Sequence, residues 1–97
     1  YALAIDNTKT DVTWDQFRKV FSENSGESFY GAWCLSYLEP SLKNMVVPEN
    51  KKLFVSGLCP VAESLQPNLI QLKTNFECLD YARTQSEILR KTIETLE

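Results

Sequence analysis

The chain has 97 residues, a net charge of −3 and 43% hydrophobic residues, which predicts one small soluble domain over residues 1–97. Such a domain has room for one core, but not for a deep private pocket as well. Its basic and acidic residues are interspersed, whereas nucleic-acid binding needs clustered lysine and arginine. No apolar run reaches the roughly 18 residues of a membrane span. We therefore expect no nucleic acid and no membrane among its partners.

The counts of histidine and cysteine exclude several kinds of chemistry. Histidine is absent, which excludes His-based triads and proton shuttles. Cys34, Cys59 and Cys78 are too far apart in sequence for the close ligand pairs of a zinc site, so we expect no metal. Their odd number and wide spacing suggest reduced thiols in the cytoplasm. Because free cysteine is often buried, we predict that all three are small core residues.

The chain begins with a predicted strand followed by a polar linker. In "YALAI", Leu3 and Ile5 lie on one face of a strand that ends near Asp6. The segment "DNTKTD" is the linker. A strand at the first residue suggests that the chain is a piece of a longer polypeptide.

A helix from about residue 14 to 24 has the strongest local signals. Thr13 and Gln16 have capping-box spacing, and Val12 and Phe17 have the spacing of a hydrophobic staple. Gly26 suits a left-handed cap at its end. The apolar stripe of this helix consists of Trp14, Phe17, Val20 and Phe21.

The middle of the chain is harder to assign. "FYGAWCLSYLEP", residues 29–40, alternates with large apolar groups at odd positions, which favours a strand; a helix is the alternative, and Pro40 limits either one. "VPENKK" indicates a loop. "KLFVSG", residues 52–57, is a weak candidate for a short strand.

Three elements are predicted in the last third. Pro60 suits the first position of a short helix that reaches Leu65 and that Pro67 must end. "NLIQLKT" reads as a strand, with Ile70 and Leu72 on one side. A long helix from about 78 to 96 follows, with Asn75 as a possible N-cap. The periodic apolar positions of this helix are Leu79, Ala82, Leu89, Ile93 and Leu96. Two pairs, Arg83 with Glu87 and Arg90 with Glu94, are spaced as exposed ion pairs.

The order of elements predicts an α/β protein of the α+β kind. Its small, mainly antiparallel sheet is covered on one face by two main helices.

No catalytic constellation is evident in these residues. A Schiff-base lysine needs desolvation or a neighbouring charge, and Lys73 lies at a polar strand end, so we predict a solvated scaffold residue. The carboxylates of Glu23, Glu27, Glu94 and Glu97 are expected on solvated faces. In the aromatic cluster Phe29, Tyr30, Trp33 and Tyr37, most side chains are expected in the core and Tyr30 is expected to face outward.

Three segments together carry a resemblance to a known family. "FYGAWCLSYLEPSL", then "CPVAESLQPNLIQLKTN", then a helix containing "ILRKTIETL" resemble the C-terminal small domain of DegT-type (DegT/DnrJ/StrS) pyridoxal-phosphate-dependent sugar aminotransferases. The likeness extends from about Tyr1 to Leu96, and the "CPVAESLQP…LKTN" block is its most specific part.

The resemblance implies the small domain of a fold-type-I enzyme whose large N-terminal domain carries pyridoxal phosphate and its lysine. It implies a homodimer that aminates a nucleotide-linked keto-sugar, with an amino acid such as glutamate as donor, for lipopolysaccharide or surface-glycan biosynthesis. The fragment itself would be inactive and bind no cofactor. Many relatives have a His-Tyr pair where this chain has Ser36 and Tyr37. Tyr37 is therefore the one substrate-binding residue that the resemblance carries over.

Two alternatives stay open from the sequence. A related branch of the same family dehydrates its sugar instead of aminating it. In a different class of function, the chain is a stand-alone α/β module that binds a protein partner through its small sheet and has no catalytic activity.

Overall fold

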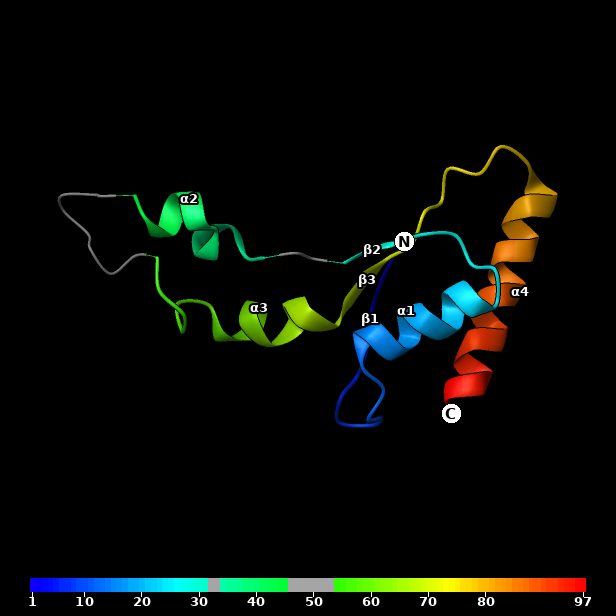
Figure 1. Cartoon of the computed structure of the whole chain (residues 1–97), viewed down its shortest axis with the longest axis horizontal. Helices are drawn as coiled ribbons and strands as arrows, with labels where there is room; N and C mark the ends of the chain where they lie inside the picture. Colours follow the sequence, from blue (N-terminus) through cyan, green and yellow to red (C-terminus); the bar gives the residue numbers. More distant parts are fainter. Residues whose placement is uncertain (32–33, 46–53) are drawn as a thin grey trace.

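The structure is a computed structural model that describes residues 1–31, 34–45 and 54–97. Within these ranges the chain forms a three-stranded antiparallel sheet and four α-helices, which confirms the α+β fold class (Figure 1). The strands are β1 (Ala2–Ala4), β2 (Tyr30–Gly31) and β3 (Leu69–Gln71). The helices are α1 (Trp14–Glu23), α2 (Pro40–Lys43), α3 (Pro60–Leu65) and α4 (Leu79–Leu96), with 3-10 turns η1 (Ser36–Leu38) and η2 (Gln66–Asn68).

The sheet has the order β1-β3-β2, and both outer strands run antiparallel to β3. Ile70 lies opposite Leu3 on one side and opposite Gly31 on the other. Its side chain is only 2% exposed and packs in one cluster with Phe17 and Phe21 of α1 and with apolar residues of α4. The predicted covering of one sheet face by two main helices is confirmed, and the core lies between them and β3.

The start of α1 is as predicted, but its end differs by one residue. Thr13 Oγ1 accepts a hydrogen bond from the Gln16 amide at 3.2 Å, and Gln16 Oε1 accepts one from the Thr13 amide at 2.8 Å. The helix ends at Glu23, so the left-handed position of a Schellman motif falls on Ser25, with φ 68°, and not on Gly26.

Gly26 is required for a different reason. A Cβ atom at this position would lie 2.4 Å from the ring of Phe21, so only glycine fits without displacing that ring. Its amide donates to the carbonyl of Phe21 at 2.8 Å, which is one of the two hydrogen bonds of the Schellman motif.

The predicted apolar stripe of α4 is partly wrong. Leu79 and Ile93 are 64% and 42% exposed, and the buried positions are Gln85 and Thr92. Gln85 Oε1 accepts from the Glu27 amide at 2.9 Å, and Thr92 Oγ1 accepts from the side chain of Asn24 at 3.2 Å. These two polar side chains are buried because they accept hydrogen bonds from Asn24 and Glu27, in the segment just after α1.

The ends and surface of α4 contain two further corrections. The N-cap is Cys78, which makes no side-chain cap bond, and not Asn75. Arg83 pairs with Asp80 at 3.4 Å instead of with Glu87, whereas the predicted pair of Arg90 with Glu94 is confirmed at 3.1 Å.

The long strand predicted within residues 29–40 is also wrong. Of the described residues in this segment, only Tyr30–Gly31 pairs with β3; residues 36–43 form η1 and α2, and Pro40 begins a helix. The reason is non-local: the Tyr37 hydroxyl donates to Glu63 of α3, and residues 36–38 form η1 instead of an extended strand. Residues 54–57 form bends and a turn and no strand, while "VPENKK" lies outside the described residues.

The molecule is elongated. Its radius of gyration is 17.2 Å and its extents are 55 × 32 × 18 Å, whereas a compact chain of about 100 residues has a radius near 13 Å. Residues 34–45 and 54–65, which contain α2 and α3, form an arm that projects from the sheet and from α1 and α4 (Figure 1). We call residues 1–31 and 66–97 the body.

Candidate functional site

An aromatic cluster forms the centre of the body. Phe29 makes edge-to-face contacts with Trp14, Phe17 and Phe21, at ring separations of 5.3 to 5.8 Å. The next residue, Tyr30, is 59% exposed, so its predicted outward orientation is confirmed. Trp33 lies outside the described residues.

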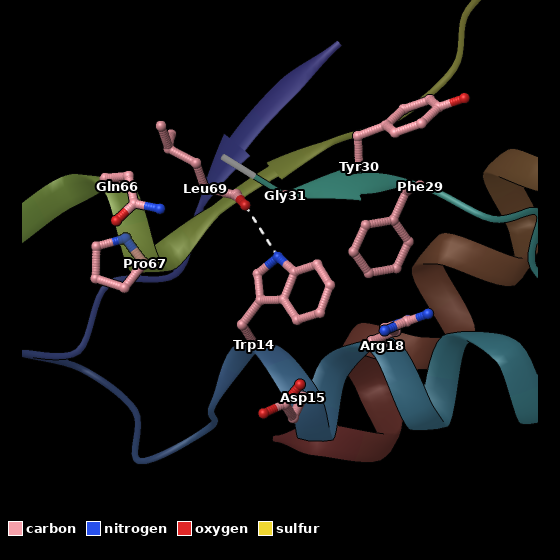
Figure 2. Close-up of a pocket in the computed structure, with 9 residues that line it drawn as sticks. All are labelled: Trp14, Asp15, Arg18, Phe29, Tyr30, Gly31, Gln66, Pro67 and Leu69. Atoms are coloured by element: carbon pink, nitrogen blue, oxygen red, sulfur yellow. Dashed lines mark hydrogen bonds between the residues drawn. The ribbon is translucent and has the colours of Figure 1, made fainter. Parts of the chain in front are cut away.

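A groove of about 470 Å³ opens beside this cluster, between the start of α1 and the strands (Figure 2). Trp14 Nε1 donates to the carbonyl of Leu69 at 3.0 Å, which fixes the indole across β3. A Cβ atom on Gly31 would lie 2.9 Å from the indole, so glycine permits this close approach. The guanidinium of Arg18 lies 5.5 Å from the centre of the Trp14 ring.

The chemistry of the groove suits a polar ligand that contains a ring. Its walls are aromatic, and Asp15 and Arg18 add one carboxylate and one cation. Aromatic surfaces with a few polar groups bind such ligands by stacking and hydrogen bonding. The ionisable side chains among the residues drawn in Figure 2 are Asp15, Arg18 and Tyr30.

A second polar centre lies in the arm, around Glu63 of α3. The Tyr37 hydroxyl donates a short hydrogen bond to Glu63 Oε1. The amide of Gly57 donates to both carboxylate oxygens at 2.8 and 2.9 Å, Ser56 Oγ donates at 3.0 Å, and the amide of Cys59 at 3.4 Å. One carboxylate therefore joins η1, the turn before α3 and α3 itself. We call these five residues the Glu63 clamp.

The clamp shifts the pKa of two groups. The hydrogen bonds from Tyr37, the Gly57 amide and Ser56 stabilise the carboxylate and lower the pKa of Glu63 to about 2. Desolvation and the hydrogen bond to Glu63 favour the neutral phenol and raise the pKa of Tyr37 to about 12. The pair is thus fixed as carboxylate and phenol over the whole neutral range.

This geometry bears on the role predicted for Tyr37. Its hydroxyl proton is directed to Glu63, so the residue cannot donate that proton to a substrate without breaking the clamp. The sequence did not single out Glu63, although it lies in the quoted "CPVAE" segment. The available signal was a turn glycine, Gly57, and a carboxylate in the first turn of a helix that begins with Pro60.

Lys73 has a partner that the sequence did not suggest. Its Nζ lies 3.3 Å from Glu27 Oε2, and the side chain is 43% exposed. The Tyr81 hydroxyl donates to Glu27 Oε1 at 2.9 Å. This hydrogen bond, with Lys73 next, lowers the pKa of Glu27, and the same carboxylate raises the pKa of Tyr81. Glu27 therefore ties the segment before β2 to the end of β3 through Lys73 and to α4 through Tyr81.

Lys73 does not fit a cofactor lysine. Its amine is paired with a carboxylate and partly exposed, whereas a Schiff-base lysine is desolvated or placed near another cation. The scaffold interpretation therefore stands. Two of the other carboxylates lie on the surface as expected, Glu23 near Lys19 at 4.0 Å and Glu94 with Arg90.

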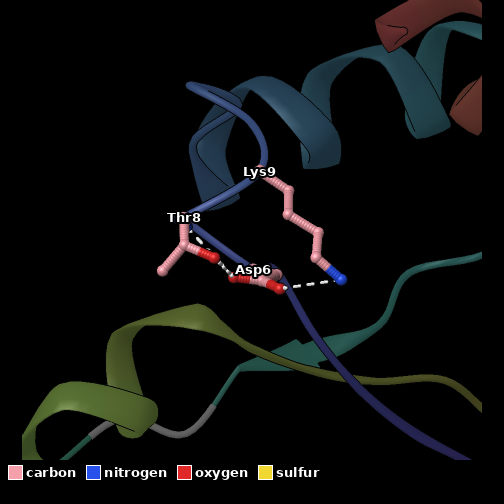
Figure 3. Close-up of polar contacts among 3 residues, drawn as sticks. All are labelled: Asp6, Thr8 and Lys9. Atoms are coloured by element: carbon pink, nitrogen blue, oxygen red, sulfur yellow. Dashed lines mark hydrogen bonds and ion pairs between the residues drawn. The ribbon is translucent and has the colours of Figure 1, made fainter.

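A third polar group closes the turn after β1 (Figure 3). Asp6 accepts hydrogen bonds from the amide and the hydroxyl of Thr8 at 3.0 and 2.6 Å, and it pairs with Lys9 at 3.5 Å. The bonds from Thr8 are the main reason that the pKa of Asp6 is lowered. All three residues are exposed, and their contacts are those of a local Asx turn, so they shape the linker and form no site.

The prediction of buried cysteines is wrong: Cys34, Cys59 and Cys78 are exposed. Cys59 and Cys78 occupy the N-cap positions of α3 and α4, where the chain enters a helix from the surface. In the described ranges no three His, Cys, Asp or Glu side chains are grouped so that they could hold a metal ion. The same part of the chain has no helix that is long and apolar enough to cross a membrane.

Comparison with known proteins gives no relative. No family model, no curated protein and no solved structure matches the chain.

Proposed function

We propose that the chain is the small domain of a DegT-type, pyridoxal-phosphate-dependent aminotransferase that acts on a nucleotide-linked keto-sugar. The observation that supports this proposal is the Glu63 clamp. It brings two segments of the resemblance together, because Tyr37 belongs to "FYGAWCLSYLEPSL" and Glu63 to "CPVAESLQP". Residues that are distinctive in sequence thus form one structural unit.

In this proposal the domain shapes a substrate pocket and does not perform the chemistry. Lys73 would not be the cofactor lysine, since it is paired with Glu27. The cofactor and its lysine would come from a large domain, and two such subunits would form the homodimer in the cytoplasm. The arm would lie against the large domain, because it exposes Met45, Val55, Leu58, Val61 and Leu65.

The test is to express the longest reading frame that contains this chain and to purify its product. We expect visible absorbance from lysine-bound pyridoxal phosphate and glutamate-dependent amination of a nucleotide-linked keto-sugar. The 97-residue chain alone is the control and should show neither property. A product without cofactor absorbance would contradict the proposal, and dehydration of the sugar without amination would assign the other branch of the family.

A matched pair of variants tests the role of the clamp in that enzyme. Glu63→Gln should lower kcat/KM for the sugar while cofactor absorbance stays unchanged, because the arm loses its charged centre. Glu23→Gln changes a carboxylate that is 62% exposed and should leave both unchanged. Equal activity of the two variants would show that the enzyme does not need the Glu63 clamp.

The exposed apolar residues of the arm also favour the second candidate, a stand-alone interaction module. The same expression experiment separates the two. If the reading frame encodes no cofactor domain, the interaction module is the better explanation.

A further inference from the structure

β1 is an edge strand of the sheet, with β3 as its neighbour. The Tyr1 carbonyl accepts from the Leu72 amide at 2.8 Å, and the Ile5 amide donates to the Asn68 carbonyl at 3.0 Å. In an antiparallel ladder such residues alternate with residues whose N–H and C=O point the other way. The backbone groups of Ala2 and Ala4 therefore point away from β3.

This edge lacks the usual protection against pairing. β1 contains no charged residue and no proline, and its two outward-bonding residues have only methyl side chains. Both Ala2 and Ala4 are exposed. A three-residue strand is short, but its ladder with β3 extends from Tyr1 to Ile5.

An apolar groove of about 460 Å³ lies on the helix side of the same edge. Its apolar lining includes Leu3, Ile5, Val12, Phe17, Ile93 and Leu96. Ile93 is 42% exposed although it faces this groove from α4. A strand added beside β1 would place every second side chain over these residues, since alternate side chains point to the same face.

We propose that a second copy of this chain occupies the edge, with its β1 antiparallel to β1 about a two-fold axis. The occupant must carry apolar side chains at alternate positions and small ones between them. β1 itself has this pattern, with Leu3 and Ile5 inward and Ala2 and Ala4 outward. The pairing is therefore self-complementary, as a two-fold interface requires, and it joins two sheets into one of six strands.

The outward groups fix the register of this pair. Ala2 must exchange hydrogen bonds with Ala4 of the second copy, which places Leu3 on the two-fold axis opposite Leu3 of the second copy. Leu3 then forms a non-hydrogen-bonded pair, in which the Cα atoms are about 4.5 Å apart. The inference does not rest on the proposed function, because it uses only the edge and its groove.

Disulfide trapping tests the register. In a background of Cys34→Ser, Cys59→Ser and Cys78→Ser, oxidised Leu3→Cys should form a covalent dimer, because its Cα separation suits a disulfide. The control Ala4→Cys should not form the dimer. Position 4 of one copy lies diagonally across from position 4 of the other, at a separation of about 7–8 Å. Failure of Leu3→Cys to cross-link, or equal cross-linking by Ala4→Cys, would overturn the proposal.

Light scattering tests the edge without cysteine. At high concentration the unmodified chain should have twice its monomer mass of 11.1 kDa. Ala4→Pro removes the outward amide and leaves the ladder with β3, so it should return the mass to that of one chain. Ala4→Thr keeps the amide and should stay dimeric. A single-chain mass for the unmodified protein would also overturn the proposal.

Discussion

The body and the arm are held together in different ways. Among the described residues, the buried hydrophobic ones are Phe17, Phe21 and Ile70, and all belong to the body. The described part of the arm has no buried residue and exposes five large apolar side chains. Its order comes from the Glu63 clamp instead. Burial of apolar area stabilises a region cooperatively, whereas a polar centre at the surface fixes geometry locally.

The two regions should therefore respond to different perturbations. Changes in apolar volume should affect the body, and changes in charge should affect the arm.

The largest effect is expected from Ile70→Ala. Ile70 is 2% exposed at the centre of the sheet, and truncation of a buried isoleucine costs about 2–5 kcal/mol. Urea denaturation followed by circular dichroism should show this loss of unfolding free energy. Val61→Ala, at a residue of the arm that is 78% exposed, is the control and should change it by less than about 0.5 kcal/mol. Similar losses in both variants would refute the separation.

The arm should respond to pH through the two ionisable groups at the centre of its clamp, Glu63 and Tyr37. The folded pKa of Glu63 is about 2, below its usual 4.5, so its stabilisation is complete above pH 4.5 and lost as the pH falls toward 2. The folded pKa of Tyr37 is about 12, above its usual 10, so its stabilisation is complete below pH 10 and lost as the pH rises toward 12.

NMR of the Gly57 amide should report this transition of the arm, and the Ile70 amide should report the body. With Glu63→Gln we expect the acid transition at Gly57 to disappear and its hydrogen exchange at neutral pH to be roughly tenfold faster. Coincident acid transitions at Gly57 and Ile70 would show that the clamp also holds the body.

A smaller effect in the body is expected from Thr13→Ala. The Thr13 side chain caps α1 and forms half of the capping box, and its loss costs about 0.5–2 kcal/mol. The melting temperature should fall, while the Gly57 amide in the arm keeps its protection. Thr13→Ser retains the oxygen and should be close to the unmodified protein. A melting temperature unchanged by Thr13→Ala would mean that the cap does not limit stability.

The smallest effect should be a gain. Ser25 has φ 68°, a conformation that favours glycine, so Ser25→Gly should raise the unfolding free energy by about 0.5–1 kcal/mol. Gly26→Ala should do the opposite, since its Cβ atom would meet the Phe21 ring at 2.4 Å. Thermal unfolding of the two variants checks the sign, and a loss on Ser25→Gly would contradict the assignment of the left-handed position.

Elements whose signals are local could be predicted from the sequence. The capping box of α1, the proline that begins α3 and the alternation of β3 each depend on residues close in the chain. The arm could not be predicted, because its central contact joins Tyr37 to Glu63, two residues that lie far apart in the sequence. Gln85 and Thr92 broke the apolar period of α4 for a similar reason, since their partners lie after α1.

The candidate site shows the same division. The outward position of Tyr30 follows from alternation within its own segment, and it could be predicted. The ion-pair partner of Lys73 could not be predicted, because Glu27 lies in the segment before β2, far from Lys73 in the sequence. Glu63 was missed because its hydrogen-bond donors lie on η1 and on the turn before α3, which only the fold brings to its carboxylate.

The three exposed thiols have a practical consequence. Cys34 and Cys59 belong to the arm, whereas Cys78, the N-cap of α4, belongs to the body. A nitroxide or fluorophore on one arm thiol and another on Cys78 would span the two regions along a molecule that is 55 Å long. Electron-spin or energy-transfer measurements on such doubly labelled protein would follow the orientation of the arm directly, in solution and upon association.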